Sequence, residues 1–171
     1  MENKLQALIH DKDFDLKKCQ FDLTPHFNGK PKKALWTSTY IDKESISSWY
    51  LWCCMEDFEL KDCLYLIEPK SNIKVVELND VEDLLDLPTV RVFNQVTLDF
   101  ERIAKRGYFG IHLTKEGFWS IKDLSIYHLN SVVSSFWGWD CESTVWFNTD
   151  WINEIWLEED GLIRKSKMID Y

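Results

Sequence analysis

The sequence lacks the features that mark several large classes of protein. No apolar run in its 171 residues approaches the length that spans a membrane, and residues 1–5 do not have the character of a signal peptide. There is also no internal repeat, low-complexity segment or linker between domains. We therefore expect a single globular domain over residues 1–171, in a reducing cytoplasm and without a membrane partner.

Cysteine and histidine are present, but without the spacings that build disulfide frameworks or metal sites. The five cysteines include no C-x-x-C pair, and the four histidines are dispersed, so we predict neither a disulfide framework nor a bound metal. No G-x-G-x-x-G, P-loop or G-x-S-x-G motif occurs, which argues against the chemistries those motifs support. A nucleophilic pair of Cys141 and His112 stays open as an alternative.

Positive charge is in the minority. The chain has 20 lysines and arginines against 29 aspartates and glutamates, which gives a net charge of −9. Direct binding to nucleic acid needs cationic side chains that displace counterions from phosphates, so we do not expect it. The same charge permits a basic protein partner or mimicry of nucleic acid by a carboxylate-rich face, and it also helps to keep a tryptophan-rich protein in solution.

Aromatic and aliphatic residues are plentiful and are grouped in short segments. Hydrophobic residues make up 45% of the chain and nine residues are tryptophan, so we expect a real core and several tryptophans in a core or cleft. Short strand-like segments alternate with a few helical ones. The pattern predicts an α+β fold with mixed or antiparallel sheets.

Local patterns predict where these elements lie. Segments rich in β-branched and aromatic residues are predicted strands: 21–23, 34–40, 63–67, 73–78, 108–114, 143–147 and 161–169. Residues 4–9 fit either a strand or a short helix. The predicted helices are 45–58, with Ser45 or Ser47 as N-cap and Trp49 and Trp52 facing the core, then 81–87 after Asp80, 97–105 and 151–156. We expect segments 63–67 and 73–78 to pair with each other, and a turn at 115–117.

Two acidic residues stand at the head of one predicted strand. Asp140 and Glu142 are separated by one residue and precede the β-branched and aromatic run 144–147. Side chains at i and i+2 of a strand point to the same face, so these two carboxylates are expected to project together. A solvated pair at the end of a strand is the alternative interpretation. Paired carboxylates beside tryptophans form a plausible site for stabilising a positive charge.

Two short motifs resemble those of the mono-ADP-ribosyltransferases, which transfer ADP-ribose from NAD to a target. In one branch of that family a serine–threonine–serine strand supports the nicotinamide-ribose pocket, and Thr37-Ser38-Thr39 is similar to it. An acidic-x-glutamate motif at the head of a later strand completes the pattern, and Asp140-Cys141-Glu142 is similar to that. The resemblance covers these motifs and a compatible order of strands. It implies an ADP-ribosyltransferase-like fold with NAD as substrate.

The resemblance also implies roles for single residues. Glu142 would stabilise the oxocarbenium-like transition state, Asp140 would orient or deprotonate the acceptor, and Ser38 would position Glu142 or the ribose. The remaining residues of the implied NAD pocket are Trp36, Thr37, Thr39, Tyr40 and Trp139. Among them, the aromatic rings of Trp36, Tyr40 or Trp139 would stack on the cationic nicotinamide.

The chain departs from the family in the group that holds the NAD phosphates. One branch uses an arginine on the first strand, and this chain has none before Arg91. A second branch uses a histidine there and a tyrosine later, and His26 and Tyr40 can be matched to that pattern. Lysines at positions 30, 32 and 33 are a further source of positive charge, in what is otherwise expected to be a solvated loop.

Two hypotheses from different classes follow. The first is an ADP-ribosyltransferase-like enzyme acting on a macromolecular target, of the toxin or phage-effector type. The second is a non-enzymatic acidic inhibitor, of the immunity or anti-defence type, that binds a basic protein. Both expect a protein target or partner. The discriminating observation is whether Ser38, Glu142 and an aromatic ring share one cleft.

Overall fold

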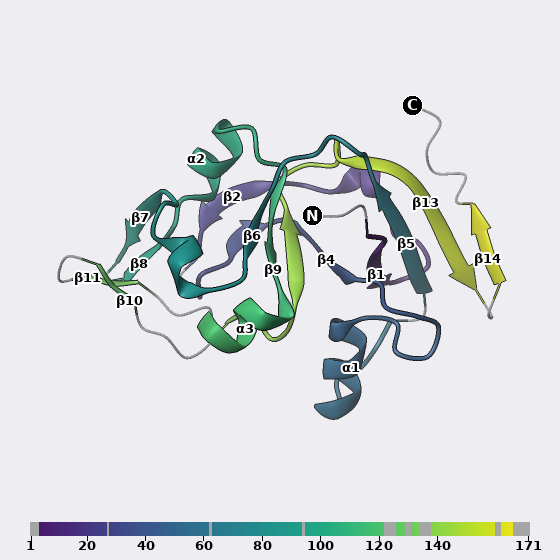
Figure 1. The fold of residues 1–171 in the computed structure, drawn as a ribbon. Helices are drawn as coiled ribbons and strands as arrows, with labels where there is room; N and C mark the ends of the chain where they lie inside the picture. The colour runs from purple at the N-terminus through teal and green to yellow at the C-terminus, as the bar shows by residue number, and fades with distance from the viewer. Residues whose placement is uncertain are drawn as a thin grey trace.

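The computed structural model describes residues 4–26, 28–61, 63–93, 95–121, 126–128, 131–133, 138–159 and 162–165. Within these ranges the chain forms one large mixed sheet, two smaller sheets and three α-helices (Figure 1). The α+β prediction with a few helices is confirmed at this level. None of the helices in these ranges has both the length and the apolar character that a membrane crossing requires.

The large sheet has eight strands in the order β14-β13-β5-β1-β4-β12-β9-β6. Their bounds are β1 Gln6–His10, β4 Leu35–Thr39, β5 Cys63–Pro69, β6 Val75–Leu78, β9 Gly110–Leu113, β12 Ser143–Trp146, β13 Ile152–Glu159 and β14 Leu162–Lys165. Neighbours pair antiparallel except β6 and β9, which are parallel. Strands β4 and β12 lie side by side in the middle, where the two motifs of the sequence meet.

The smaller elements surround this sheet. One small sheet is the hairpin of β2 (Asp22–Pro25) and β3 (Pro31–Lys33), and the other contains β7 (Thr89–Val92), β8 (Gln95–Leu98), β10 (Ile126–His128) and β11 (Ser131–Val133). The α-helices are α1 (Ser48–Met55), α2 (Phe100–Lys105) and α3 (Lys115–Ile121). Two 3-10 turns, η1 (Leu16–Lys18) and η2 (Val81–Leu84), complete the described elements. In Figure 1, α2 and α3 flank the β6–β9 end of the sheet.

The large sheet is buried on both faces, with a separate core on each. Val145 and Trp146 are adjacent on β12, so they point to opposite faces, and each is fully buried. Val145 belongs to a core that includes Ile111 of β9 and Phe100 of α2. Trp146 belongs to the other core with Ile67 of β5, and its ring stacks on Trp151 at 3.7 Å.

Several local predictions are confirmed. Segment 4–9 contributes to a strand, β1 (Gln6–His10), rather than a helix, and segment 34–40 contains β4. Helix α1 begins after Ser47, whose side chain accepts a hydrogen bond from the Tyr50 amide. Segment 108–114 contains β9, which lies between β12 and β6 and has all four of its residues buried. Of segment 161–169, Leu162–Lys165 is strand β14, and the rest lies outside the described residues.

The predicted pairing of segments 63–67 and 73–78 is wrong. Both segments are strands, β5 and β6, but they stand far apart in the sheet order. Strand β5 uses its two edges to pair with β1 and β13, and β6 pairs with β9. The connection between them is not a hairpin turn, because its ends bond elsewhere: the Lys70 amide donates to Trp151 and the Lys74 carbonyl accepts from Phe109.

The predicted helix 97–105 starts too early. Residues Gln95–Leu98 form strand β8, and the helix proper, α2, begins at Phe100. Asp99 is its N-cap, because its side chain accepts a hydrogen bond from the Arg102 amide at 3.0 Å. Gly107, at φ +84°, follows the helix.

Two further predictions of local structure are wrong. The turn expected at 115–117 is the start of α3, where Gly117 brings the helix so close to β6 that a Cβ there would overlap the Leu78 backbone. The helix expected at 151–156 is the strand β13. An irregularity in its pairing with β5 between Ile152 and Glu154 shifts the alternation of apolar residues, so their spacing imitates a helix.

Candidate functional site

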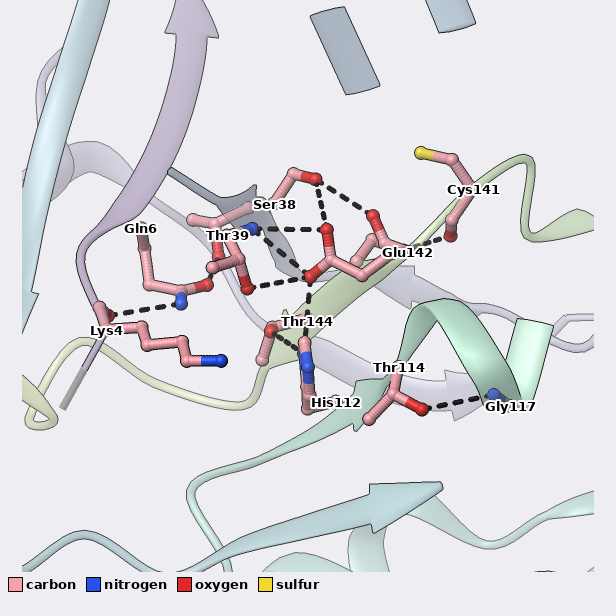
Figure 2. A network of polar contacts seen from close by, with 12 residues as sticks. Lys4, Gln6, Ser38, Thr39, His112, Thr114, Gly117, Cys141, Glu142 and Thr144 are labelled. Atoms are coloured by element: carbon pink, nitrogen blue, oxygen red, sulfur yellow. Dashed lines mark hydrogen bonds and ion pairs between the residues drawn. The ribbon is translucent and has the colours of Figure 1, made fainter. Parts of the chain in front are cut away.

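Glu142 is a buried carboxylate whose oxygens are held by neighbours on β4. Its side chain is only 7% exposed. The Ser38 hydroxyl donates to Oε2 at 2.8 Å, and the Thr39 hydroxyl donates to Oε1 at 2.9 Å. The Thr39 amide also donates to the carboxylate, at 3.2 Å from Oε1 (Figure 2). A carboxylate with these donors stays fixed in one orientation.

The strand register explains why these residues meet. Thr144 of β12 lies opposite Thr37 of β4, so position 142 comes opposite Thr39 just before β12 begins. Ser38 adds a second link, because its hydroxyl also lies 2.9 Å from the Glu142 carbonyl oxygen and accepts from the Trp49 amide at 3.3 Å. Ser38 therefore ties β4, the head of β12 and the first turn of α1 together.

His112 of β9 completes the polar network around Glu142. Its Nδ1 atom lies 2.8 Å from the Thr144 hydroxyl and 3.5 Å from Oε1 of Glu142 (Figure 2). Burial lowers the pKa of His112 below its ordinary value, and the nearby Glu142 charge opposes this shift only in part. The imidazole is therefore neutral at pH 7.

A cavity of about 380 Å³ lies next to this network. Its volume falls within the range of roughly 300–1,000 Å³ that is common for small-molecule sites. Three tryptophans contribute to its wall, and the chemically distinctive lining residues are Lys30, Trp36, Ser38, Trp49, Trp139 and Asp140. Glu142 is not among the lining residues that the structure describes. Ser38 lines the cavity and donates a hydrogen bond to the Glu142 carboxylate, so it lies between the two.

One side of the cavity combines aromatic rings with charge. The rings of Trp36 and Trp139 meet edge to face at 4.8 Å. The Lys30 ammonium lies 5.2 Å from the centre of the Trp36 ring and 3.6 Å from the Asp140 carboxylate. Lys30 and Asp140 are each about one-third exposed, at 29% and 35%. The pair is therefore accessible from solvent.

Cys141 lies between the two acidic residues and also lines the cavity. Burial, followed by the charges of Glu142 and Asp140, raises the pKa of its thiol to about 12. A thiol with that pKa stays protonated at neutral pH and is a poor nucleophile. The Nδ1 atom of His112 contacts the Thr144 hydroxyl at 2.8 Å and lies 3.5 Å from Glu142, which further weakens the alternative of a Cys141–His112 pair.

The structure brings some of the predicted site residues together and leaves others apart. Ser38, Thr39 and Glu142 form one hydrogen-bonded group, and Trp36, Trp139 and Asp140 line the adjacent cavity. Asp140 lines the cavity and Glu142 does not, so the two carboxylates have different surroundings rather than the shared one that the strand alternation predicts. Strand β12 starts only at Ser143, so the two-residue alternation does not reach back to Asp140.

The other predicted NAD-binding residues have different surroundings. Thr37 lines the cavity, but its hydroxyl donates to Gln6 at 2.7 Å and accepts from the Trp146 indole at 2.8 Å. Tyr40 lies beyond the end of β4, where it bridges to Ser47. His26 precedes the hairpin turn that carries Lys30. Neither Tyr40 nor His26 is among the lining residues in the described part of the chain.

No family model, curated protein or solved structure matches the chain. The link to mono-ADP-ribosyltransferases therefore depends on the motifs and their geometry.

Sequence reasoning missed two residues of the site. Trp49 was assigned to the core together with Trp52, but both rings are half-buried, stack on each other at 5.0 Å, and leave Trp49 in the cavity wall. Lys30 is predicted from the sequence only as one of three lysines in a loop that could supply positive charge for phosphates, and no local signal connects it to Asp140. The helical spacing of Trp49 and Trp52 does predict that the two rings meet.

Proposed function

We propose that this protein cleaves the nicotinamide–ribose bond of NAD and transfers ADP-ribose to a macromolecular acceptor. The observation that carries the proposal is the Glu142 carboxylate, which Ser38 and Thr39 hold beside a tryptophan-lined cavity. Ser38 lines that cavity together with Trp36 and Trp139 and donates a hydrogen bond to Glu142, so the carboxylate is linked to the cavity through Ser38 rather than lining it. The motif resemblance supplies the choice of NAD.

The chemistry divides between the two acidic residues. Nicotinamide leaves with the electron pair of the C–N bond, and the ribose develops positive charge that a fixed carboxylate stabilises. Glu142 supplies this negative charge, because the neighbouring His112 is neutral. A nucleophile of the acceptor then forms a bond to the anomeric carbon, and Asp140, which is more exposed, takes its proton.

The test is release of nicotinamide from NAD by wild-type protein and by Glu142→Gln. Gln keeps the size of the side chain and removes the charge, so we expect a fall in rate of about 10²-fold or more. Release is measured by chromatography with labelled NAD, so that no acceptor needs to be known. Glu116→Gln on the exposed surface of α3 is the matched control and should leave the rate unchanged.

Two outcomes contradict the proposal. One is a wild-type protein that neither binds NAD nor releases nicotinamide. The other is equal rates for wild type and Glu142→Gln. Because Glu142 is buried, thermal unfolding of each variant is compared first, and Asp140→Asn, at a more exposed position, provides a second variant that should slow transfer to a nucleophile.

Helix α1 favours a second candidate function, a non-enzymatic protein that binds a basic partner. Its outer side exposes Leu51 and Met55, which are 42% and 75% exposed, and Phe58 just beyond the helix is 54% exposed. Three exposed acidic residues, Glu56, Asp57 and Glu59, also follow the helix. An apolar patch with an acidic rim is complementary to a cationic amphipathic segment.

This candidate predicts capture that depends on both charge and the apolar patch. Binding of a basic protein should weaken at about 1 M salt, where the Debye length is roughly 3 Å. Met55→Asp should reduce capture as well, whereas Lys43→Asp on the loop before α1 is the control for the added charge. If salt and the Met55→Asp substitution both leave capture of the basic protein unchanged, this surface of α1 is not the binding site.

A further inference from the structure

A lysine of the chain itself occupies the aromatic and acidic side of the cavity. The Lys30 ammonium lies over the Trp36 ring, 5.2 Å from its centre, and 3.6 Å from the Asp140 carboxylate. An aromatic face beside a carboxylate is the arrangement that proteins use to bind organic cations. In this protein, the Trp36 ring and the Asp140 carboxylate already contact the Lys30 ammonium.

The β2–β3 hairpin holds Lys30 in this place. The His26 amide donates to the Lys30 carbonyl at 2.7 Å, and the Lys30 amide donates to the Asn28 side chain at 3.2 Å. Gly29 adopts a φ of +77°, which the turn requires. The turn also contacts the segment before Asp140, because a Cβ on Gly138 would come within 2.7 Å of the Asn28 carbonyl oxygen.

The lysine is a replaceable occupant rather than a tightly bound one. Its side chain is 29% exposed, and an ion pair that open to solvent contributes little to stability. An ammonium group is also compact and strongly hydrated, so it gains less from an aromatic surface than a large, weakly hydrated cation does. A flat organic cation can therefore take its place.

We propose that the cavity binds organic cations of the pyridinium or quaternary ammonium type and that Lys30 competes for the same position. Trp36 supplies the aromatic face, Asp140 supplies the counter-charge, and the ligand displaces the Lys30 ammonium towards solvent. The inference rests on the proposed function in using the same cavity. It does not require any NAD to be cleaved.

The test compares N-methylnicotinamide, which is a pyridinium cation, with neutral nicotinamide of nearly the same shape. Binding is followed by quenching of tryptophan fluorescence. We expect Lys30→Met to tighten binding of the cation by about 3- to 10-fold and Asp140→Asn to weaken it by a similar factor. Neither variant should change nicotinamide binding by more than about 2-fold.

Two further variants sharpen the result. Lys32→Met removes an exposed charge from the same hairpin and should leave both ligands unaffected. The double variant Lys30→Met with Asp140→Asn should bind the cation more weakly than Lys30→Met alone, since the counter-charge is gone and only the aromatic face remains. All four proteins should unfold at similar temperatures, because the replaced side chains are partly or fully exposed.

The inference is overturned if Lys30→Met leaves cation binding unchanged or weakens it, if wild type binds nicotinamide as tightly as the cation, or if no protein binds the cation. Its failure is distinguishable from failure of the proposed function. A protein that binds N-methylnicotinamide with these variant effects, yet never releases nicotinamide from NAD, would support the cation site and contradict the transferase.

Discussion

Glu142 is stable inside the protein because the side chains around it supply hydrogen-bond donors in place of water. Burying an ionised carboxylate is costly unless it is paired or hydrogen-bonded. Ser38 and Thr39 provide that compensation from β4, across 104 and 103 positions of sequence. His112 is close enough to interact, yet burial keeps it neutral. A proton on His112 would therefore change the balance of charge at the site.

The pH dependence of stability should report this buried histidine. Because the folded-state pKa of His112 is lowered from 6.5, the unfolded chain takes up the proton more readily. The stability contributed by His112 is present above about pH 6.5 and is lost as the pH falls towards the folded-state pKa. We expect His112→Gln to remove this part of the pH dependence, as measured by urea unfolding from about pH 7.5 to pH 5. Parallel pH profiles for the two proteins would contradict the assignment.

Individual elements reach the site through specific contacts. Helix α1 is tied to it by the bond from the Trp49 amide to the Ser38 hydroxyl, and the β2–β3 hairpin by the ion pair of Lys30 with Asp140. Helix α3 has a supporting role. Its Gly117 amide donates to the hydroxyl of Thr114, the residue that joins β9 to the helix, so α3 begins directly after the strand that carries His112.

Gly117→Ala tests how closely α3 is docked. The added Cβ would overlap the Leu78 backbone, which cannot rotate away as a side chain could. We expect a loss of about 1–3 kcal/mol in the free energy of unfolding, despite the better helix propensity of alanine. Glu116→Ala, exposed on the same helix, is the control and should be nearly neutral. A Gly117→Ala protein as stable as wild type would show that α3 can move away from β6.

For the whole molecule, the main feature is a sheet with a core on each face. Ile67 and Ile111 are both fully buried, but they belong to opposite cores. The strands that separate the cores contribute to both, since neighbouring residues of β12 alternate between them. A protein built in this way should unfold as one cooperative unit.

Truncations in the two cores test this cooperativity. Ile67→Ala and Ile111→Ala should each lower the free energy of unfolding by about 2–5 kcal/mol. If residues 1–171 form one domain, both variants shift the same single transition in denaturant and in heat. Ile41→Ala, at a position that is 50% exposed, serves as control. Two transitions, each moved by only one variant, would contradict the one-domain prediction.

The sequence by itself determined the elements whose causes are local. Strand β4 follows from its β-branched and aromatic residues, and the start of α1 from Ser47, because propensities and caps act within a few residues. The two motifs with Ser38 and Glu142 were also visible, although their meaning depended on a resemblance.

Only the tertiary structure decided which strands pair and what surrounds the site. The irregular register of β13 gives its apolar residues a helical spacing, so the sequence pattern predicts a helix where the structure has a strand. Strand β5 pairs with β1 and β13, which are distant in the sequence, and not with β6, the next strand along the chain. The ion pair of Lys30 with Asp140 joins residues 110 positions apart. Contacts of this kind depend on how the whole sheet assembles, and no short segment carries the information that fixes them.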